Sequence, residues 1–153
     1  MKIAVLLHNV RSAHNVGSIF RTADAAGAAK VFLSGYTPRP IDRFGRVQKD
    51  ITKTALGAEK FLAWEYKKSP TVIISKLKKV GWHITAVEQN KKSMDYKKFR
   101  LKKPTLFIFG NEVEGIPTNI LKQCDAILEI PMHGRKESLN VSVAAGIILF
   151  SIR

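Results

Sequence analysis

Three clusters of residues in this sequence have the types and spacing to hold a ligand. The first, residues 9–24, contains Asn15, a residue type that favours the start of a helix, and Arg21, which has apolar neighbours. An arginine on a largely apolar helix is costly unless an acidic side chain pairs with it. We therefore expect a functional role for Arg21, with Glu112 or Glu114 as its partner. The alternative is that Asn15 only caps a helix and that Arg21 extends to solvent.

The second cluster, residues 109–117, places a tight turn between a strand and a helix. Gly110 and Gly115 have the spacing of a phosphate-binding loop, but Ile116 and Pro117 replace the Lys-Ser/Thr pair that such a loop needs. The three-glycine pattern of dinucleotide-binding proteins is missing as well. The turn therefore predicts close approach of the backbone to a ligand without a dedicated phosphate clamp. A purely structural turn is the alternative.

The third cluster, residues 130–142, is a polar loop that leads into an apolar helix. Ser138 and Asn140 open this helix, and the free N–H groups of a helix start suit a carboxylate or a phosphate. Simple capping by either residue is the alternative. The histidines lack the spacing of metal ligands, and there is no nucleophile elbow, so we expect neither a metal centre nor a hydrolase.

Short apolar runs alternate with helical patterns along the chain, which is typical of an α/β fold with a mostly parallel sheet. The runs are continuously apolar, as expected for strands that are buried on both faces. The predicted strands are Ile3–His8, Lys30–Ser34, Trp82–Glu88, Thr105–Gly110 and Ala126–Ile130, with a shorter candidate at Phe61–Trp64. The predicted helices are Asn15–Ala26, Ser69–Val80, Pro117–Lys122 and Asn140–Ile152, and Tyr36–Asp50 is the longest predicted loop.

Size and composition indicate a cytoplasmic protein. The 153 residues have room for one domain with a substantial core. No apolar run approaches the roughly 20 residues needed to cross a bilayer, and no signal-peptide core is present. The single cysteine, Cys124, can form no internal disulfide. We therefore expect neither secretion nor membrane insertion.

The charge of the chain points to a nucleic-acid partner. The net charge is +14, far more than solubility requires. Residues 67–103 contain twelve Lys/Arg against only Glu88 and Asp95. A basic surface attracts a polyanion through counterion release, largely without reading its sequence. A solvated basic face is the alternative, and membrane binding is disfavoured because no Trp- or Phe-rich amphipathic helix accompanies the lysines.

Taken together and in this order, the clusters resemble the signature motifs of the SpoU/TrmH class of the SPOUT superfamily of knotted RNA methyltransferases. The resemblance covers essentially the whole chain, and its third motif is the most specific. The matching segments are Asn15-Val-Gly-Ser-Ile-Phe-Arg21-Thr-Ala, Phe109-Gly-Asn-Glu-Val-Glu-Gly115, and Ile130-Pro-Met through Ser138-Leu-Asn-Val-Ser142, with Lys53-Thr-Ala-Leu-Gly-Ala58 as a further element between the first two.

The resemblance implies a mostly parallel sheet flanked by helices, with a C-terminal deep trefoil knot, a rare exception to the unknotted rule. It implies S-adenosylmethionine bound in the knot, and a homodimer with the active site near the interface. The implied activity is methylation of a ribose 2′-hydroxyl in tRNA or rRNA. Transfer RNA is favoured because small single-domain relatives include modifiers of the wobble position.

Three alternatives to this activity stay open on the sequence. The first is a base methyltransferase of the same knotted superfamily, against which the third motif argues. The second is a catalytically silent RNA-binding protein or assembly factor. A generic nucleotide-binding α/β protein is the least favoured, because the glycine turn does not suit a nucleotide phosphate.

The resemblance also implies roles for individual residues. The catalytic and substrate-orienting positions are Asn15, Arg21, Glu112, Ser138 and Asn140. The cofactor is expected against Gly110, Asn111, Glu112, Gly115, Ile130, Met132 and Leu139, and no metal is implied. In this family the first-motif arginine is proposed to activate the hydroxyl. Because a guanidinium normally stays protonated, we expect Arg21 to hold the target ribose and its phosphate instead.

RNA recognition is expected to come from the catalytic domain itself. Members of the class that act on large ribosomal RNA often carry an extra N-terminal recognition domain, whereas residues 1–153 are expected to form a single SpoU-type domain. We therefore expect the long loop and the basic region to bind RNA across the dimer. The predicted contacts are Arg39, Arg43, Arg46, Lys97 and Lys98.

Overall fold

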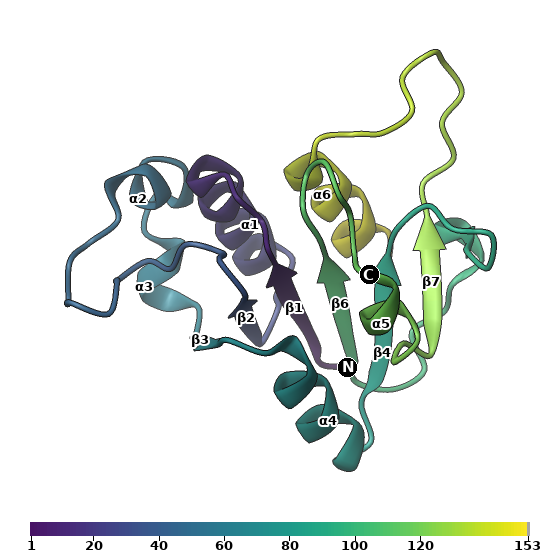
Figure 1. The fold of residues 1–153 in the computed structure, drawn as a ribbon, viewed down its shortest axis with the longest axis horizontal. Helices are drawn as coiled ribbons and strands as arrows, with labels where there is room; N and C mark the ends of the chain where they lie inside the picture. Colours follow the sequence, from purple (N-terminus) through teal and green to yellow (C-terminus); the bar gives the residue numbers. More distant parts are fainter. Residues whose placement is uncertain (153) are drawn as a thin grey trace.

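A single sheet of parallel strands, in the order β3-β2-β1-β6-β4-β7-β5, forms the centre of the computed structural model, which describes residues 1–152 (Figure 1). The mostly parallel α/β sheet predicted above is therefore confirmed. The strands are β1 (Ile3–His8), β2 (Lys30–Ser34), β3 (Trp64–Lys67), β4 (His83–Val87), β5 (Met94–Asp95), β6 (Thr105–Phe109) and β7 (Ala126–Glu129).

Helices cover both faces of the sheet. They are α1 (Ala13–Ala25), α2 (Lys49–Ala55), α3 (Ala58–Phe61), α4 (Pro70–Lys79), α5 (Thr118–Leu121) and α6 (Val141–Ser151), with a short 3-10 helix η1 (Tyr96–Lys98) after β5. Buried side chains of α1, α2, α3 and α6 share one core layer, and those of α4 and α5 share the other. No helix within residues 1–152 is both long and apolar enough to cross a membrane.

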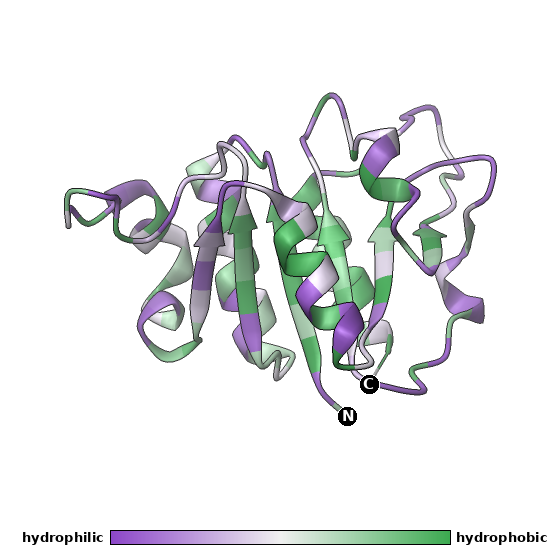
Figure 2. Cartoon of the chain, turned by 60° about the horizontal axis from the view of Figure 1, so that its bottom comes forward, coloured by the Kyte–Doolittle hydropathy of each residue, from purple (hydrophilic) through white to green (hydrophobic). Residues whose placement is uncertain are grey.

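The two core layers explain why the central strands are apolar without interruption. Successive side chains of a strand point to opposite faces. Val5 and Leu7 of β1 therefore join the core under α1 and α6, whereas Ala4 and Leu6 join the core under α4 and α5. All four are fully buried. Figure 2 shows the central strands mostly in green, the colour of hydrophobic residues.

Local exceptions to the predicted elements lie mainly between residues 36 and 67. The long loop ends at Gln48, and α2 begins at Lys49, where no helix was predicted. The predicted strand Phe61–Trp64 is wrong, since Phe61 ends α3 and the strand begins at Trp64. Both helices are too short to show a helical period clearly. The two-residue strand β5 was not predicted for the same reason.

Gly17 allows α1 and α2 to pack closely, because a Cβ at this position would collide with the Thr54 hydroxyl and the Ile51 carbonyl oxygen. We expect Gly17→Ala to lower the free energy of unfolding by roughly 1–3 kcal/mol, as overpacking does. Urea denaturation measures this change. Gly146→Ala in α6 is the matched control, since its Cβ would meet only the Thr22 methyl at 3.8 Å. Equal losses in the two variants would contradict a tight contact at Gly17.

Candidate active site

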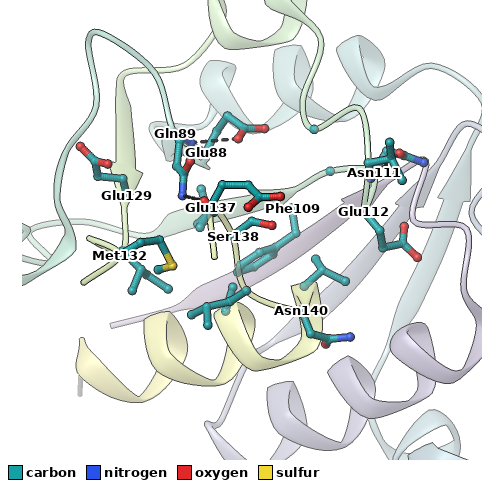
Figure 3. Close-up of a pocket in the computed structure, with 18 of the residues that line it drawn as sticks. Glu88, Gln89, Phe109, Asn111, Glu112, Glu129, Met132, Glu137, Ser138 and Asn140 are labelled. Atoms are coloured by element: carbon teal, nitrogen blue, oxygen red, sulfur yellow. Dashed lines mark hydrogen bonds between the residues drawn. The ribbon is translucent and has the colours of Figure 1, made fainter. Parts of the chain in front are cut away.

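A cavity of about 540 Å³ opens at the carboxyl ends of β4, β6 and β7 (Figure 3). Its walls are formed by these strand ends, by the turn at residues 110–115, and by the segment from Ile130 to the first turn of α6. Ligands of open α/β sheets bind at the carboxyl ends of the strands, near the point where the strand order reverses. Here the order reverses between β1 and β6, immediately beside the cavity.

Two of the three sequence clusters meet in this cavity. All seven residues predicted to contact the cofactor line it: Gly110, Asn111, Glu112, Gly115, Ile130, Met132 and Leu139. Of the predicted catalytic residues, Glu112, Ser138 and Asn140 line it as well. In the view of Figure 3, Glu112 and Asn140 lie at one end and Met132 and Glu129 at the other. Asn15 and Arg21 are not among the lining residues.

A chain of hydrogen bonds joins one residue from each cluster. The Asn140 side-chain amide donates to Asn15 Oδ1 at 3.2 Å, and the Asn15 amide donates to Glu112 Oε2 at 3.3 Å. Asn140 Oδ1 accepts hydrogen bonds from the N–H groups of Ser142 (2.8 Å) and Val143 (3.4 Å), so it caps α6. Each amide has its oxygen towards a donor and its nitrogen towards an acceptor. The chain therefore fixes the orientation of both amides.

Glu112 also fastens the second cluster to the loop before α1. Its two carboxylate oxygens accept the N–H groups of Arg11 and Ser12, each at 2.9 Å. Partial burial alone would raise the pKa of Glu112, but the hydrogen bonds from Arg11, Ser12, its own N–H group and Asn15 outweigh it and lower this pKa. The carboxylate therefore stays ionised at neutral pH and holds the two loops together.

This arrangement predicts a pH dependence of stability. The pKa of Glu112 in the folded protein lies below its ordinary value of 4.5. The contribution of the ionised Glu112 to the free energy of unfolding is therefore fully present above pH 4.5, and it is lost as pH falls through the lowered pKa. We expect the stability difference between wild type and Glu112→Gln to be constant from neutral pH down to about pH 5 and to shrink below it. Urea midpoints measured from pH 3 to 7 test this.

Glu114→Gln is the matched control for that experiment. Glu114 lies on the same turn, and its carboxylate has no hydrogen bond or ion pair to any residue within 1–152. Its substitution should leave the acid limb of the stability curve unchanged. A difference curve for Glu112→Gln that stays flat to pH 3, or one that the Glu114 variant reproduces, would contradict the role of Glu112.

The turn of the second cluster has the backbone geometry that its glycines suggested. The N–H and carbonyl groups of Asn111 and Gly115 bond reciprocally at 3.0 and 3.2 Å. Gly115 has a φ of 71°, which favours glycine. The Asn111 side chain accepts two N–H groups of the turn and donates to the Asn9 carbonyl oxygen at 3.0 Å. The turn is therefore rigid, with its backbone against the cavity.

Asn15 does not cap α1, contrary to the expectation that it begins the helix. Ser12 is the capping residue, and its hydroxyl accepts the Asn15 N–H at 3.2 Å. The Asn15 side chain is therefore available to Glu112 and Asn140. The signal for this assignment was present in the sequence, since serine is as good a cap as asparagine.

The predicted ion pair of Arg21 with Glu112 or Glu114 is wrong. Arg21 is exposed on α1, and within residues 1–152 its guanidinium has no hydrogen bond or ion pair. Arg21 is six residues beyond Asn15, and α-helical rise places it about 9 Å further along the axis. The carboxylate of Glu112 lies at the start of α1 instead. The desolvation argument fails because Arg21 is on the open side of the helix.

The cavity also has acidic and amide side chains that the sequence analysis did not single out. Glu88, Gln89, Glu129 and Glu137 line it. Glu88 accepts the Ile116 N–H at 2.8 Å and the Gln89 N–H at 2.9 Å, and the Gln89 amide donates to the Glu137 carbonyl oxygen at 2.6 Å (Figure 3). For Glu88, Gln89 and Glu129, a position at or next to the end of a predicted strand was the signal that could have identified them. Glu137 lies in the loop before α6 and had no such signal.

The predicted RNA-binding residues lie at opposite edges of the sheet. Arg39, Arg43 and Arg46 follow β2 in the long loop, and the Arg39 guanidinium stacks on the Tyr66 ring of edge strand β3 at 4.0 Å. Lys97 and Lys98 are exposed in η1, next to the other edge strand, β5. One copy of the chain therefore does not bring the two groups together.

Comparison with known proteins gives the same family along nearly the full length. Residues 2–150 match the SpoU rRNA Methylase family. A tRNA (guanosine(18)-2′-O)-methyltransferase of Aquifex aeolicus is 33% identical over 97% of this chain and 67% of its own length. A 23S rRNA (guanosine-2′-O-)-methyltransferase of Pseudomonas aeruginosa is 31% identical over 98% of this chain and 58% of its own length.

Solved structures agree with these relatives. The AdoMet-bound rRNA methyltransferase from Sinorhizobium meliloti superposes with a TM-score of 0.89 at 30% identity, over 98% of this chain and 55% of that chain. The chain thus spans between about half and two thirds of the length of these three proteins. The match includes all three clusters and the sheet that positions them. The chain therefore belongs to the SpoU rRNA methylase family.

Proposed function

We propose that this protein is an RNA ribose 2′-O-methyltransferase that uses S-adenosylmethionine. The observation that carries the proposal is the hydrogen-bonded chain Asn140–Asn15–Glu112, which joins all three family motifs at one end of the cavity. Named relatives that methylate a ribose 2′-oxygen in tRNA or rRNA support the reaction type. Transfer RNA is the favoured substrate, and a cytoplasmic location accords with it.

The residues of the cavity fit S-adenosylmethionine. A volume of about 540 Å³ lies in the range of small-molecule sites. The apolar side chains Phe109, Ile130 and Leu139 suit the adenine ring, and backbone groups of the Gly110–Gly115 turn suit its polar edge. Glu88, Glu129 and Glu137 supply negative charge for a sulfonium and an ammonium group in a strongly basic protein. Bound there, the cofactor supplies an electrophilic methyl group.

The protein must then align the 2′-oxygen of the target ribose with that methyl group. Asn140 and Ser138 open α6 at the end of the cavity where Glu112 lies, so they are placed to orient the ribose. Glu112 and Asn15 hold the loops on either side in register. Arg21 holds the ribose and its phosphate, because an always-charged fork of donors suits a phosphodiester.

A homodimer explains the position of Arg21. This residue does not line the cavity of its own copy, although its family motif places it among the catalytic positions. Its exposed guanidinium has no partner within residues 1–152. We infer that Arg21 reaches the cavity of a second copy related by a two-fold axis. The active site is then complete only in the dimer.

The C-terminal segment forms the trefoil knot of the family in this proposal. Strand β7 lies between β4 and β5, which are consecutive in the chain. The segment that connects β4 to β5, residues 88–93, crosses β7 at the level of Leu128, near the carboxyl end of that strand. In the proposed knot, the chain that leaves β7 passes through the loop that this connection forms. The hydrogen bond from Gln89 to Glu137 joins the connection to the segment that leaves β7.

A methyl-transfer assay tests the proposal. The purified chain is incubated with S-adenosylmethionine labelled in its methyl group and with unfractionated tRNA or rRNA from cells that lack the active gene. We expect label to enter RNA, with more in tRNA than in rRNA. The absence of label in both pools, with RNA binding retained, would favour a silent RNA-binding protein.

A further inference from the structure

The loop between β2 and α2 ends in a rigid turn, residues 41–47, which we call the Phe44 hairpin. Ile41 and Val47 form an antiparallel bridge at its base. The Asp42 carboxylate accepts the N–H groups of Phe44 at 2.8 Å and of Arg46 at 2.9 Å, and the Arg46 side chain at 2.8 Å. These bonds within the turn fix its tip in one conformation.

The Phe44 hairpin presents an exposed aromatic ring next to two guanidinium groups. Phe44 is 66% exposed. The guanidinium of Arg43 lies 4.8 Å from the centre of its ring, and that of Arg46 lies 4.9 Å from it. An exposed phenylalanine gains nothing from burial in the fold, so packing does not account for it. A ring that is open to solvent and flanked by guanidinium groups is suited to an anionic ligand with an aromatic part.

The hairpin is remote from the cavity. The arginine at its root, Arg39, stacks on Tyr66 of β3, at one edge of the sheet. The cavity lies at the ends of β6, β4 and β7, towards the other edge. Figure 1 shows the loop after β2 extended at the left of the view, beyond α2 and α3, while β7 lies at the right. Phe44 therefore contributes nothing to the cofactor site of its own copy.

We propose that the Phe44 hairpin binds an unpaired base of the RNA substrate, stacked on the Phe44 ring, with the adjoining phosphates paired to Arg43 and Arg46. The inference rests on the proposed function in that RNA is the substrate. Every base has a π-face, so stacking needs no particular sequence. Bases within an A-form helix are already stacked and are inaccessible to a side chain, so the occupant is a loop, bulge or end.

Charge argues for RNA rather than a second copy of the chain on this surface. The protein has a net charge of +14, to which the tip contributes Arg43 and Arg46, the second of them ion-paired with Asp42. Two such tips in contact would repel each other, whereas a phosphodiester would neutralise them. The hairpin thus recognises single-stranded structure in the RNA away from the cavity of its own copy.

Two RNA probes of equal length test the proposal: a stem with a single-stranded loop of mixed sequence, and a blunt duplex without unpaired bases. We expect Phe44→Ala to weaken binding of the stem-loop about 5- to 100-fold and binding of the duplex less than about twofold. Because no phosphate contact is lost, its salt dependence should stay that of wild type. Arg43→Ala should weaken both probes and reduce the salt slope by roughly one.

Phe61→Ala and Phe44→Trp are the control variants. Phe61 is 80% exposed on α3, and no arginine stacks on it among residues 1–152, so its substitution should leave both affinities unchanged. Phe44→Trp retains a stacking surface and should bind like wild type. Equal loss on the duplex and the stem-loop, or an equal loss in Phe61→Ala, would overturn the proposal. So would a change of oligomeric state in Phe44→Ala, which would assign the ring to a protein contact.

The binding comparison is independent of methyl transfer. If wild type transfers no methyl group to RNA but shows the stem-loop preference, the proposed activity fails and the hairpin inference stands. If methyl transfer is present and Phe44→Ala binds both probes like wild type, only the hairpin inference fails.

Discussion

Arg21→Ala is expected to reduce methyl transfer to RNA by roughly 100- to 1,000-fold, the loss seen when one charge-stabilising donor is removed from an active site. The dissociation constant of S-adenosylmethionine should change less than about twofold, because in the proposed site Arg21 contacts the ribose and phosphate of the RNA and not the cofactor. Single-turnover rates and calorimetric titration measure the two quantities. Arg100→Ala is the control, since Arg100 is exposed and, among residues 1–152, donates only to carbonyl oxygens of Lys97 and Phe99.

Mixed dimers test whether Arg21 acts on the partner copy. A heterodimer of an Arg21→Ala chain and a Gly110→Ala chain has one intact cavity, in the Arg21→Ala copy, which faces the wild-type Arg21 of the other. If Arg21 acts across the interface, one of the two sites is complete, and roughly half of the wild-type rate should return. If Arg21 acts within its own chain, neither site has both an intact cavity and its own Arg21. At a cofactor concentration well below the dissociation constant of Gly110→Ala, the heterodimer should then be no more active than the Gly110→Ala parent. That second outcome would contradict the dimeric site.

Gly110→Ala is expected to impair the cofactor site directly. A Cβ on Gly110 would lie 2.7 Å from the carbonyl carbon and oxygen of Gly115 and 2.7 Å from Ile116 Cγ1. The first two are backbone atoms, so the Asn111–Gly115 turn must move away from its present position. An overpacked contact of this kind costs about 1–3 kcal/mol. If the turn must return to its present position to bind S-adenosylmethionine, this cost raises the dissociation constant of the cofactor roughly 5- to 100-fold.

Gly134→Ala is the matched control, because a Cβ on Gly134 would meet no atom of the described part of the chain within 4 Å. Neither Gly110 nor Gly134 has a positive φ, so alanine adds no backbone strain at either position. A thermal-shift titration separates them: the cofactor should raise the melting temperature of wild type and of Gly134→Ala alike, and less in Gly110→Ala at equal concentration. An equal shift in all three proteins would mean that the turn does not form the cofactor site.

The parallel sheet could be predicted from the sequence because its strands are buried on both faces. Ile3–His8 and Lys30–Ser34 have the predicted bounds. Strands β6 and β7 are one residue shorter than predicted at their carboxyl ends, and β4 is one residue shorter at each end. Uninterrupted apolar runs have few alternatives in a small α/β protein. The strand order was beyond the sequence, since it depends on which pairings bury the most surface. Short elements such as α2 and β5 gave no periodic signal.

The part of the site that could be predicted from the sequence is the part whose family motif requires a particular backbone conformation. The turn at residues 110–115 lines the cavity because its glycines are required for the chain path. The partner of Arg21 could not be found in this way. The cost of a buried charge applies only if the residue is buried, and exposure of Arg21 depends on how α1 packs against α2 and α6. Local pattern did not contain that information.

The acidic side chains of the cavity could not be recognised from the distribution of charge along the sequence. Glu88, Glu129 and Glu137 are far apart in the chain, and two of them lie outside the basic region of residues 67–103. Only the parallel sheet brings the ends of β4 and β7 together. The chain thus combines a net charge of +14 with a cavity lined by several carboxylates and no lysine or arginine among the described residues, and the average charge of the sequence does not reveal this contrast.

The most direct test of the account is the position of the transferred methyl group. RNA methylated by this protein is digested to nucleosides, and mass spectrometry assigns the added methyl to the sugar or the base fragment. We predict a 2′-O-methyl nucleoside, with the base fragment unchanged and the adjoining phosphodiester resistant to alkali. A methyl group on the base, with the ribose unmodified, would contradict the alignment of a 2′-hydroxyl at Ser138 and Asn140.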